Sequence, residues 1–210
     1  MAKTVNLRTI KNDAIEDVRT AIERYEKVLR LEKKGKLGYW HVWWVASMTS
    51  VELHAIWERH AESRLVAALN HAPKHFLEQQ GFVGMSGISK AFARYIIREG
   101  RSYFDFRSTG DLIGKADRCV GKTASPFRAL PTQERSYIDC LAAIRNCVVH
   151  GSRPSFATYK RKIREVYGIK AAPETGEFLN ARDNGKQSPS RYESRLHGLA
   201  NVVKRAIRKT

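Results

Sequence analysis

The sequence predicts an all-α protein, a helical bundle that ends in a basic C-terminal helical extension. Apolar residues recur at three- and four-residue intervals in several long segments, as they do on one face of an amphipathic helix. The 210 residues are enough to bury a sizeable core and favour one domain. We therefore expect residues 1–152 to form the helical domain and residues 153–210 to form a basic extension packed on it.

Two helices are predicted at the start of the chain. The first spans Asp13–Lys34, has apolar residues at helical spacing and ends in the basic stretch KKGK. The second runs from Tyr39 to about Asn70 and stops before Pro73. His41, Trp43 and Trp44 near its start could stack on nucleic-acid bases, but aromatic clusters in helices usually belong to the core.

Shorter elements are predicted in the middle of the chain and a basic helix near its end. Residues 89–98 and 109–120 have the pattern of short helices, with an extended piece at 103–106 between them and a loop at 121–130 after them. Residues 158–167 form a strongly basic helix, and 168–189 are turn-rich. A last helix opens at Ser188 and Pro189, with Tyr192, Leu196, Leu199, Val203 and Ile207 on one stripe.

The most informative segment is CLAAIRNCVVHGS, residues 140–152, within a helix that we predict to begin near Thr132 and to stop at Gly151. Arg145, Asn146 and His150 interrupt its apolar run. Asn146 and His150 are four residues apart and share a face, and Arg145 is long enough to reach toward Asn146. Arginine offers a planar fork of donors to phosphate, and histidine can exchange a proton near neutral pH. An alternative is that Arg145 pairs with a surface acid and His150 only ends the helix.

This motif resembles the R-x(4-6)-H signature of HEPN domains, here Arg145-Asn-Cys-Val-Val-His150. The upstream segment VELHAIWERHAESRLVAAL, residues 51–69, is similar to the long family helix that carries Trp-Glu and a later acid. SPFRAL, residues 125–130, is similar to the family's lead-in to the motif helix. The resemblance covers roughly residues 40–152 and rests on one specific motif and two softer ones.

The resemblance implies a HEPN-like helical bundle. HEPN domains are often dimeric, and many are metal-independent endoribonucleases of toxin, phage-defence and CRISPR-type systems, whereas others only bind nucleotides or partners. By the family pattern, Glu58 would approach the motif and orient Arg145 or His150. Glu58 and Glu62 share a helix face, and a salt bridge to Arg59 or Arg64 is the structural alternative for Glu58.

We therefore expect an endoribonuclease that acts as a symmetric homodimer, because cleavage needs a base and an acid while each chain offers one histidine in the motif. His150 would take the proton of a ribose 2′-OH, Arg145 would neutralise the phosphate and Asn146 would orient the pair. An antitoxin protein or a regulatory RNA would be a further partner. Two alternatives stay open: a non-catalytic RNA-binding or adaptor module, and a partner of a nucleotidyltransferase antitoxin.

The charge of the chain favours RNA as the partner. The 38 Lys and Arg exceed the 21 Asp and Glu by 17. Residues 150–210 contain 14 basic and 5 acidic residues, a net charge of +9, which predicts that this part grips the phosphate backbone. The candidate RNA-binding residues are Lys160, Arg161, Lys162 and Arg164.

Other classes of function fit the sequence less well. No signal region and no run long enough to span a bilayer is found, so we expect a cytoplasmic protein without membrane contact. The three cysteines indicate neither a disulfide framework nor a zinc ribbon, and no cofactor or metal is expected. Ala116–Thr123 matches a permissive nucleotide-loop pattern that would nominate Lys122 and Thr123, but its context is helical. His71 and His75 have metal-ligand spacing, but Pro73 lies between them.

Overall fold

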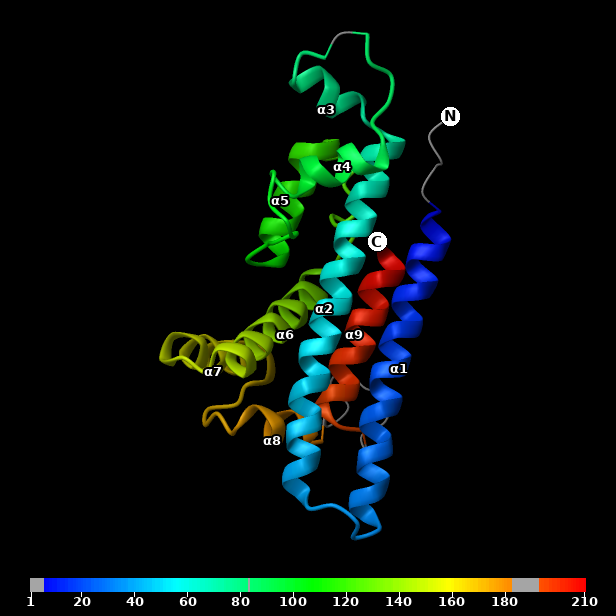
Figure 1. Cartoon of the computed structure of the whole chain (residues 1–210). Coiled ribbons are helices and arrows are strands. Elements are labelled where there is room, and N and C mark those ends of the chain that lie inside the picture. The colour runs from blue at the N-terminus through cyan, green and yellow to red at the C-terminus, as the bar shows by residue number, and fades with distance from the viewer. Residues whose placement is uncertain (1–5, 83, 183–192) are drawn as a thin grey trace. The chain divides into compact units, whose positions relative to one another are not determined.

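The structure is a computed structural model, and it describes residues 6–82, 84–182 and 193–210. In these ranges the regular structure is helical, which confirms the all-α prediction (Figure 1). The β-type pairing there is limited to an isolated bridge between Arg182 and Ser194. The helices are α1 (Leu7–Lys33), α2 (Tyr39–His71), α3 (Lys74–Gln79), α4 (Lys90–Ile97), α5 (Thr109–Val120), α6 (Thr132–His150), α7 (Arg153–Tyr167), α8 (Thr175–Asn180) and α9 (Arg195–Lys209).

The described residues group into two compact units. The first contains residues up to Ala14, Trp57–Pro131 and Ile207–Thr210, and the second contains Ile15–Ile56 and Thr132–Ala206. Helices α1, α2 and α9 each contribute residues to both units. The motif helix α6 belongs to the second unit together with α7 and α8. The boundary that the sequence predicts between residues 152 and 153 falls inside that unit and stays a prediction.

Helix α1 starts six residues earlier than the predicted Asp13, because Asn6 caps it. The Asn6 side-chain oxygen accepts hydrogen bonds from the backbone N–H groups of Arg8 at 3.0 Å and Thr9 at 3.2 Å. These bonds satisfy donors that the first turn of a helix leaves unpaired. Leu7 and Ile10 are the only apolar residues between this cap and Asp13, and the predicted start at Asp13 was too late.

Helix α7 also starts earlier than predicted, at Arg153 instead of Thr158. Ser152 is its N-cap, with the hydroxyl oxygen accepting a hydrogen bond from the Ser155 N–H at 3.3 Å, and Pro154 occupies the first turn. The turn-rich segment that we predicted at 168–189 contains the short helix α8, whose Phe178 and Leu179 are buried. The last helix begins at Arg195 and not at Ser188; Ser188, Pro189 and Tyr192 lie outside the described residues.

An aromatic cluster holds α6, α7 and α8 together in the second unit. Tyr137 on α6 meets Tyr167 on α7 edge to face, with ring centroids 5.3 Å apart. Phe178 on α8 makes edge contacts with Tyr167 at 5.1 Å and with Tyr159 at 6.0 Å. Such edge-to-face pairs stabilise packing beyond the burial of their area. The cluster fixes the basic helix α7 alongside the motif helix α6.

In the first unit, the buried Trp57 ring packs edge-on against Phe127, and a partly buried carboxylate links two helices. Glu62 on α2 accepts a hydrogen bond from the Arg98 Nε at 2.8 Å and lies 3.2 Å from the Arg94 Nε, both on α4. Residues 103–106 between α4 and α5 are irregular, with Phe104 and Phe106 buried, where the sequence predicted an extended piece. Helix α3, directly after Pro73, was not predicted.

Candidate functional site

The motif residues lie at the C-terminal end of α6, where the chain turns directly into α7. Gly151 has a left-handed backbone with φ of 56°, and its N–H donates a hydrogen bond to the Cys147 carbonyl at 3.0 Å. This geometry is the usual glycine stop of a helix, as the sequence predicted. Ser152 then caps α7, so two residues connect the helices. Tyr137, Ile138, Leu141 and Ile144 bury the opposite face of α6.

Arg145 and Asn146 are joined to each other. The Arg145 Nη1 donates a hydrogen bond to the Asn146 side-chain oxygen at 2.9 Å, which confirms that Arg145 reaches toward its neighbour. Among the described residues no carboxylate forms an ion pair with Arg145, so the alternative that it serves a surface acid is not what the structure shows. An arginine held by a neutral amide keeps its charge available to an anion.

His150 is exposed at the last position of α6. Within the part of the chain that the structure describes, its ring makes no hydrogen bond or ion pair. Asn146 is exposed one turn earlier, and Val149, the residue directly before His150, has half of its surface exposed. The last turn of α6 therefore presents an amide, an imidazole and an uncovered apolar side chain.

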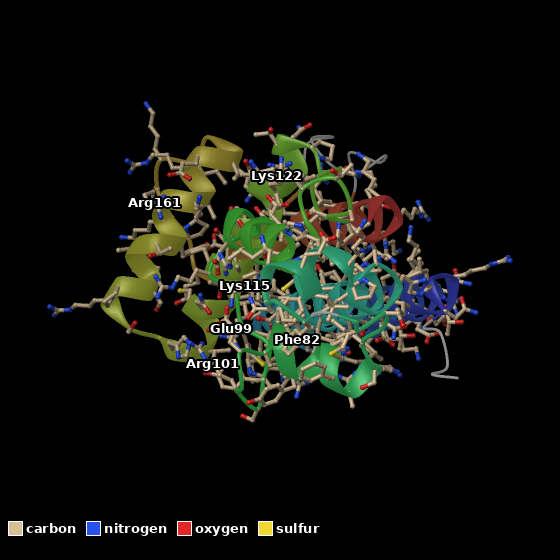
Figure 2. The ribbon with its side chains drawn as sticks, turned by 90° about the horizontal axis from the view of Figure 1, so that it is seen from above. Phe82, Glu99, Arg101, Lys115, Lys122 and Arg161 are labelled. Atoms are coloured by element: carbon tan, nitrogen blue, oxygen red, sulfur yellow. The ribbon has the colours of Figure 1, made fainter. Side chains whose placement is uncertain are left out.

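The four predicted RNA-binding residues lie on α7, and they are not equivalent. Arg161 and Lys162 both contact Glu165, with N–O distances of 2.8 and 3.0 Å. Their hydrogen bonds, that of Lys162 first, lower the pKa of the Glu165 carboxyl. Lys160 lies 4.5 Å from the centre of the Phe156 ring, and Arg164 is exposed. Figure 2 shows Arg161 on α7. One acid thus offsets part of the charge of two of these cations.

Glu58 belongs to the first unit and Arg145, Asn146 and His150 to the second. Glu58 is half-buried on α2, directly after the buried Trp57. Its approach to the motif stays a prediction. Two other acids of α2 have cationic partners: Glu52 pairs with Arg24 at 2.8 Å, and Glu62 pairs with Arg94 and Arg98 of α4 as described above.

The two other motifs of the sequence lie in the first unit. Ala116–Thr123 closes α5 instead of joining a strand to a helix, so its backbone does not form a phosphate loop. Lys122 (Figure 2) and Thr123 instead line an open pocket of about 510 Å³ with His75, Asp117 and Arg118. Arg128 hydrogen-bonds Asp117 and lowers the pKa of its carboxyl. His71 lines a different pocket from His75, and in the described ranges no three His, Cys, Asp or Glu residues form a metal-binding group.

One feature of the second unit was misjudged from the sequence. Of the cluster of His41, Trp43 and Trp44, which the sequence favoured as part of the core, Trp44 is 61% exposed, and the neighbouring Trp40, which the sequence analysis did not single out, is 60% exposed. Trp43, by contrast, is half-buried, and its backbone packs against Gly176 of α8. The signal that could have found the exposed pair is the KKGK stretch a few residues earlier, because a charged turn keeps neighbouring side chains near solvent.

This chain matches no protein-family model, no curated protein and no solved structure. None of the described helices is long and apolar enough to cross a bilayer.

Proposed function

We propose that this protein is a metal-independent endoribonuclease of the toxin or phage-defence type, with Arg145, Asn146 and His150 as its catalytic residues. The observation that carries the proposal is the end of α6. There, Arg145 is tied to Asn146 and not to an acid, and an exposed His150 lies on the turn that leads into the basic helix α7. An arginine can bind a phosphate, a histidine can accept a proton, and a basic helix can bind the backbone of a polyanion.

In the proposed reaction a neutral His150 accepts the proton of a ribose 2′-OH, and the 2′-oxygen forms a bond to the adjacent phosphorus. The bond from phosphorus to the 5′-oxygen breaks, and that oxygen takes a proton from a second, protonated histidine. Arg145 neutralises the charge that grows on the phosphate oxygens, and Asn146 orients the Arg145 guanidinium. The products are a 2′,3′-cyclic phosphate and a 5′-OH.

The second histidine comes from a second copy of the chain in this proposal. Val149 supports a protein contact at this place, because this apolar side chain, with half of its surface exposed, directly precedes His150 in the last turn of α6. Covering Val149 with the same face of another copy brings two His150 residues to one phosphate. The dimer is therefore part of the catalytic proposal and of its test.

The decisive experiment incubates purified protein with structured and single-stranded RNA, with and without EDTA, and maps the ends of the products. We expect cleavage in EDTA that leaves 2′,3′-cyclic phosphates. Arg145→Ala and His150→Ala should each lower the rate by at least about 100-fold, the range of acid–base catalysis. His71→Ala and Arg19→Ala, which remove an exposed histidine and an exposed arginine elsewhere, are the matched controls.

Wild-type rates in either motif variant would refute the assignment. RNA binding without any cleavage would favour the non-catalytic binding module instead. Lys122→Ala should leave cleavage unchanged, and a loss of activity in that variant together with ATP dependence would favour nucleotide chemistry at the α5 pocket.

A further inference from the structure

The turn between α1 and α2 carries exposed aromatic rings beside exposed lysines. Trp40, Trp44 and Met48 follow one another at four-residue spacing on one face of α2, and all three are exposed. Large apolar side chains are more often found inside a protein, and exposed aromatic groups of this kind are typical of binding sites. Trp57, further along the same helix, is fully buried, so exposure is specific to this end of α2.

The neighbouring turn is strongly basic. Residues 30–36 contain Arg30, Lys33, Lys34 and Lys36 against a single acid, Glu32, a net charge of +3 in seven residues. The three lysines are exposed. Figure 1 shows this turn, in blue, at the end of the antiparallel pair formed by the second-unit parts of α1 and α2. Cations that are free to meet a polyanion thus lie within a few residues of the tryptophans.

The backbone of the turn is fixed by hydrogen bonds. Gly35, with φ of 66°, donates to the Glu32 carbonyl at 2.8 Å, and Lys36 donates to the Leu31 carbonyl at 3.0 Å. These two bonds form a Schellman motif that closes α1. The ring of Trp40 is stacked on His41 with centroids 3.7 Å apart, and the His41 Nδ1 lies 3.2 Å from the Gly38 carbonyl oxygen. The aromatic face is therefore ordered before any ligand binds, which lowers the entropic cost of binding.

We propose that the basic-aromatic turn, defined as residues 33–36 with Trp40 and Trp44, is a binding site for single-stranded RNA. Bases stack on Trp40 and Trp44, and the lysines contact the phosphates on either side. Four residues of helix separate the two rings by about 6 Å along the axis, so each can receive a separate base. The choice of RNA as the ligand rests on the proposed function. The site adds a second RNA contact, distant in sequence from α7, that selects unpaired strands.

The charge distribution distinguishes RNA from other occupants. A second copy of the chain, paired through the same face, would bring two lysine-rich turns together and repel itself. An anionic lipid surface satisfies the lysines but leaves the ordered, stacked arrangement of Trp40 and His41 without a role. Unpaired bases use both features, because every base offers a flat face next to a phosphate.

The test uses the His150→Ala protein, so that binding is measured without cleavage. The probes are a fluorescent oligouridylate of about 12 nucleotides, within the usual site size, and an abasic oligomer of equal length and charge. Trp40→Ala and Trp44→Ala should each weaken oligouridylate binding by about 5- to 100-fold, the range of one lost stacking contact. Trp40→Phe should retain most of the affinity, and both alanine variants should bind the abasic oligomer as the parent does.

Tyr95→Ala is the matched control, because Tyr95 is 64% exposed on α4 in the first unit. It should leave both affinities unchanged. Unaltered oligouridylate binding in both tryptophan variants would overturn the proposal. So would equal affinity of the parent for the two oligomers, binding of phosphatidylserine vesicles in preference to oligouridylate, or a change of oligomeric state in Trp44→Ala measured by sedimentation.

These outcomes are separate from those of the proposed function. A wild-type protein that binds RNA through the two tryptophans but never cleaves it refutes the endoribonuclease and leaves this site intact. If the wild-type protein cleaves RNA but the tryptophan variants bind oligouridylate as well as the parent does, the endoribonuclease proposal stands and this binding site is refuted.

Discussion

At the scale of single residues, Tyr25 links the packing of the second unit to pH. Its side chain is fully buried, and its hydroxyl donates a hydrogen bond to the Asn180 side-chain oxygen at 2.6 Å. Burial raises the pKa of Tyr25 from 10.0 to about 12. Because the folded state holds the Tyr25 proton more tightly than the unfolded state, the contribution of Tyr25 to stability is fully present below pH 10. This contribution is lost as the pH rises toward 12. We expect a loss of up to roughly 3 kcal/mol over this interval, measured by urea unfolding at several pH values.

Tyr25→Phe removes the titrating group and should flatten the pH dependence between 10 and 12, at the cost of the hydrogen bond to Asn180. Tyr95→Phe, which removes an exposed hydroxyl, should keep the pH dependence of the parent. An unchanged slope in Tyr25→Phe would show that other groups cause the alkaline loss.

Gly176 lies where the backbones of α8 and α2 pack closely together. A Cβ atom on Gly176 would collide with the backbone carbonyl of Trp43, so α8 can approach α2 only through a glycine. Alanine usually stabilises a helix relative to glycine. Here we expect the opposite, a loss of roughly 1–3 kcal/mol from overpacking. Thermal unfolding checks it, with Gly87→Ala as the control, because a Cβ at Gly87 meets nothing within 4 Å.

At the scale of helices, the contribution of α7 to RNA binding can be divided. Neutralising Lys160, Arg161, Lys162 and Arg164 together should weaken binding to all sequences and lower the salt slope by up to about three, at roughly 0.7 per phosphate contact on single strands. Cleavage at saturating RNA should be retained. Unchanged binding with a collapse of turnover would instead place α7 in the active site.

A substitution at Glu165 tests the same prediction in the opposite direction, by strengthening RNA binding. Glu165→Gln releases Arg161 and Lys162 from their shared carboxylate and should strengthen RNA binding and steepen its salt dependence. The double variant Lys160→Gln, Arg164→Gln should weaken binding more than Arg161→Gln, Lys162→Gln, because Glu165 already offsets the latter pair. Filter binding at several salt concentrations measures both effects.

Helices with long apolar stripes were predicted well from the sequence, and the short or polar ones were not. The stripe through Ile138, Leu141 and Ile144 predicted α6, and Gly151 its end. Helix α8 has six residues, too few for a periodicity to appear, and is held by the burial of Phe178. Helices α1 and α7 start earlier than predicted because Asn6 and Ser152 cap them, and the spacing of apolar residues does not reveal polar caps.

For the candidate site, the sequence predicted the contact of Arg145 with Asn146, because the arginine side chain is long enough to reach its neighbour. It did not predict that Glu165 would bind two of the RNA-binding cations, since that requires the rotamers of three long side chains. The exposure of Trp40 and Trp44 also escaped it. Whether a helical tryptophan is covered depends on which distant element packs there, and α8 covers the face at Trp43.

At the scale of the whole molecule, catalysis by two copies can be tested by mixing. If one active site uses residues of two chains, adding excess Arg145→Ala protein to wild type should lower the activity per wild-type chain below that of simple dilution. Sedimentation should show a dimer, and Val149→Lys, which places a charge on the exposed apolar position, should weaken it. A fully active monomer would contradict the composite site.

The division into units predicts how truncation acts. A fragment of residues 1–152 lacks α7, α8 and the part of α9 that belongs to the second unit, and also residues 207–210 of the first. His60, buried in the first unit, has its Nε2 2.9 Å from the hydroxyl oxygen of Thr210. We therefore expect the fragment to lose cooperative thermal unfolding by circular dichroism. A sharp transition would show that the boundary predicted at residue 152 marks an independent domain.

The two-residue connection between α6 and α7 also restricts how this protein can vary in length. Gly151 is needed to stop one helix and Ser152 to start the next, so neither can be deleted without losing a cap. An inserted residue would rotate α7 about its axis and turn Tyr159, Ile163 and Tyr167 away from their partners. Related chains are therefore expected to differ here by substitution, with the spacing between His150 and the buried face of α7 held constant.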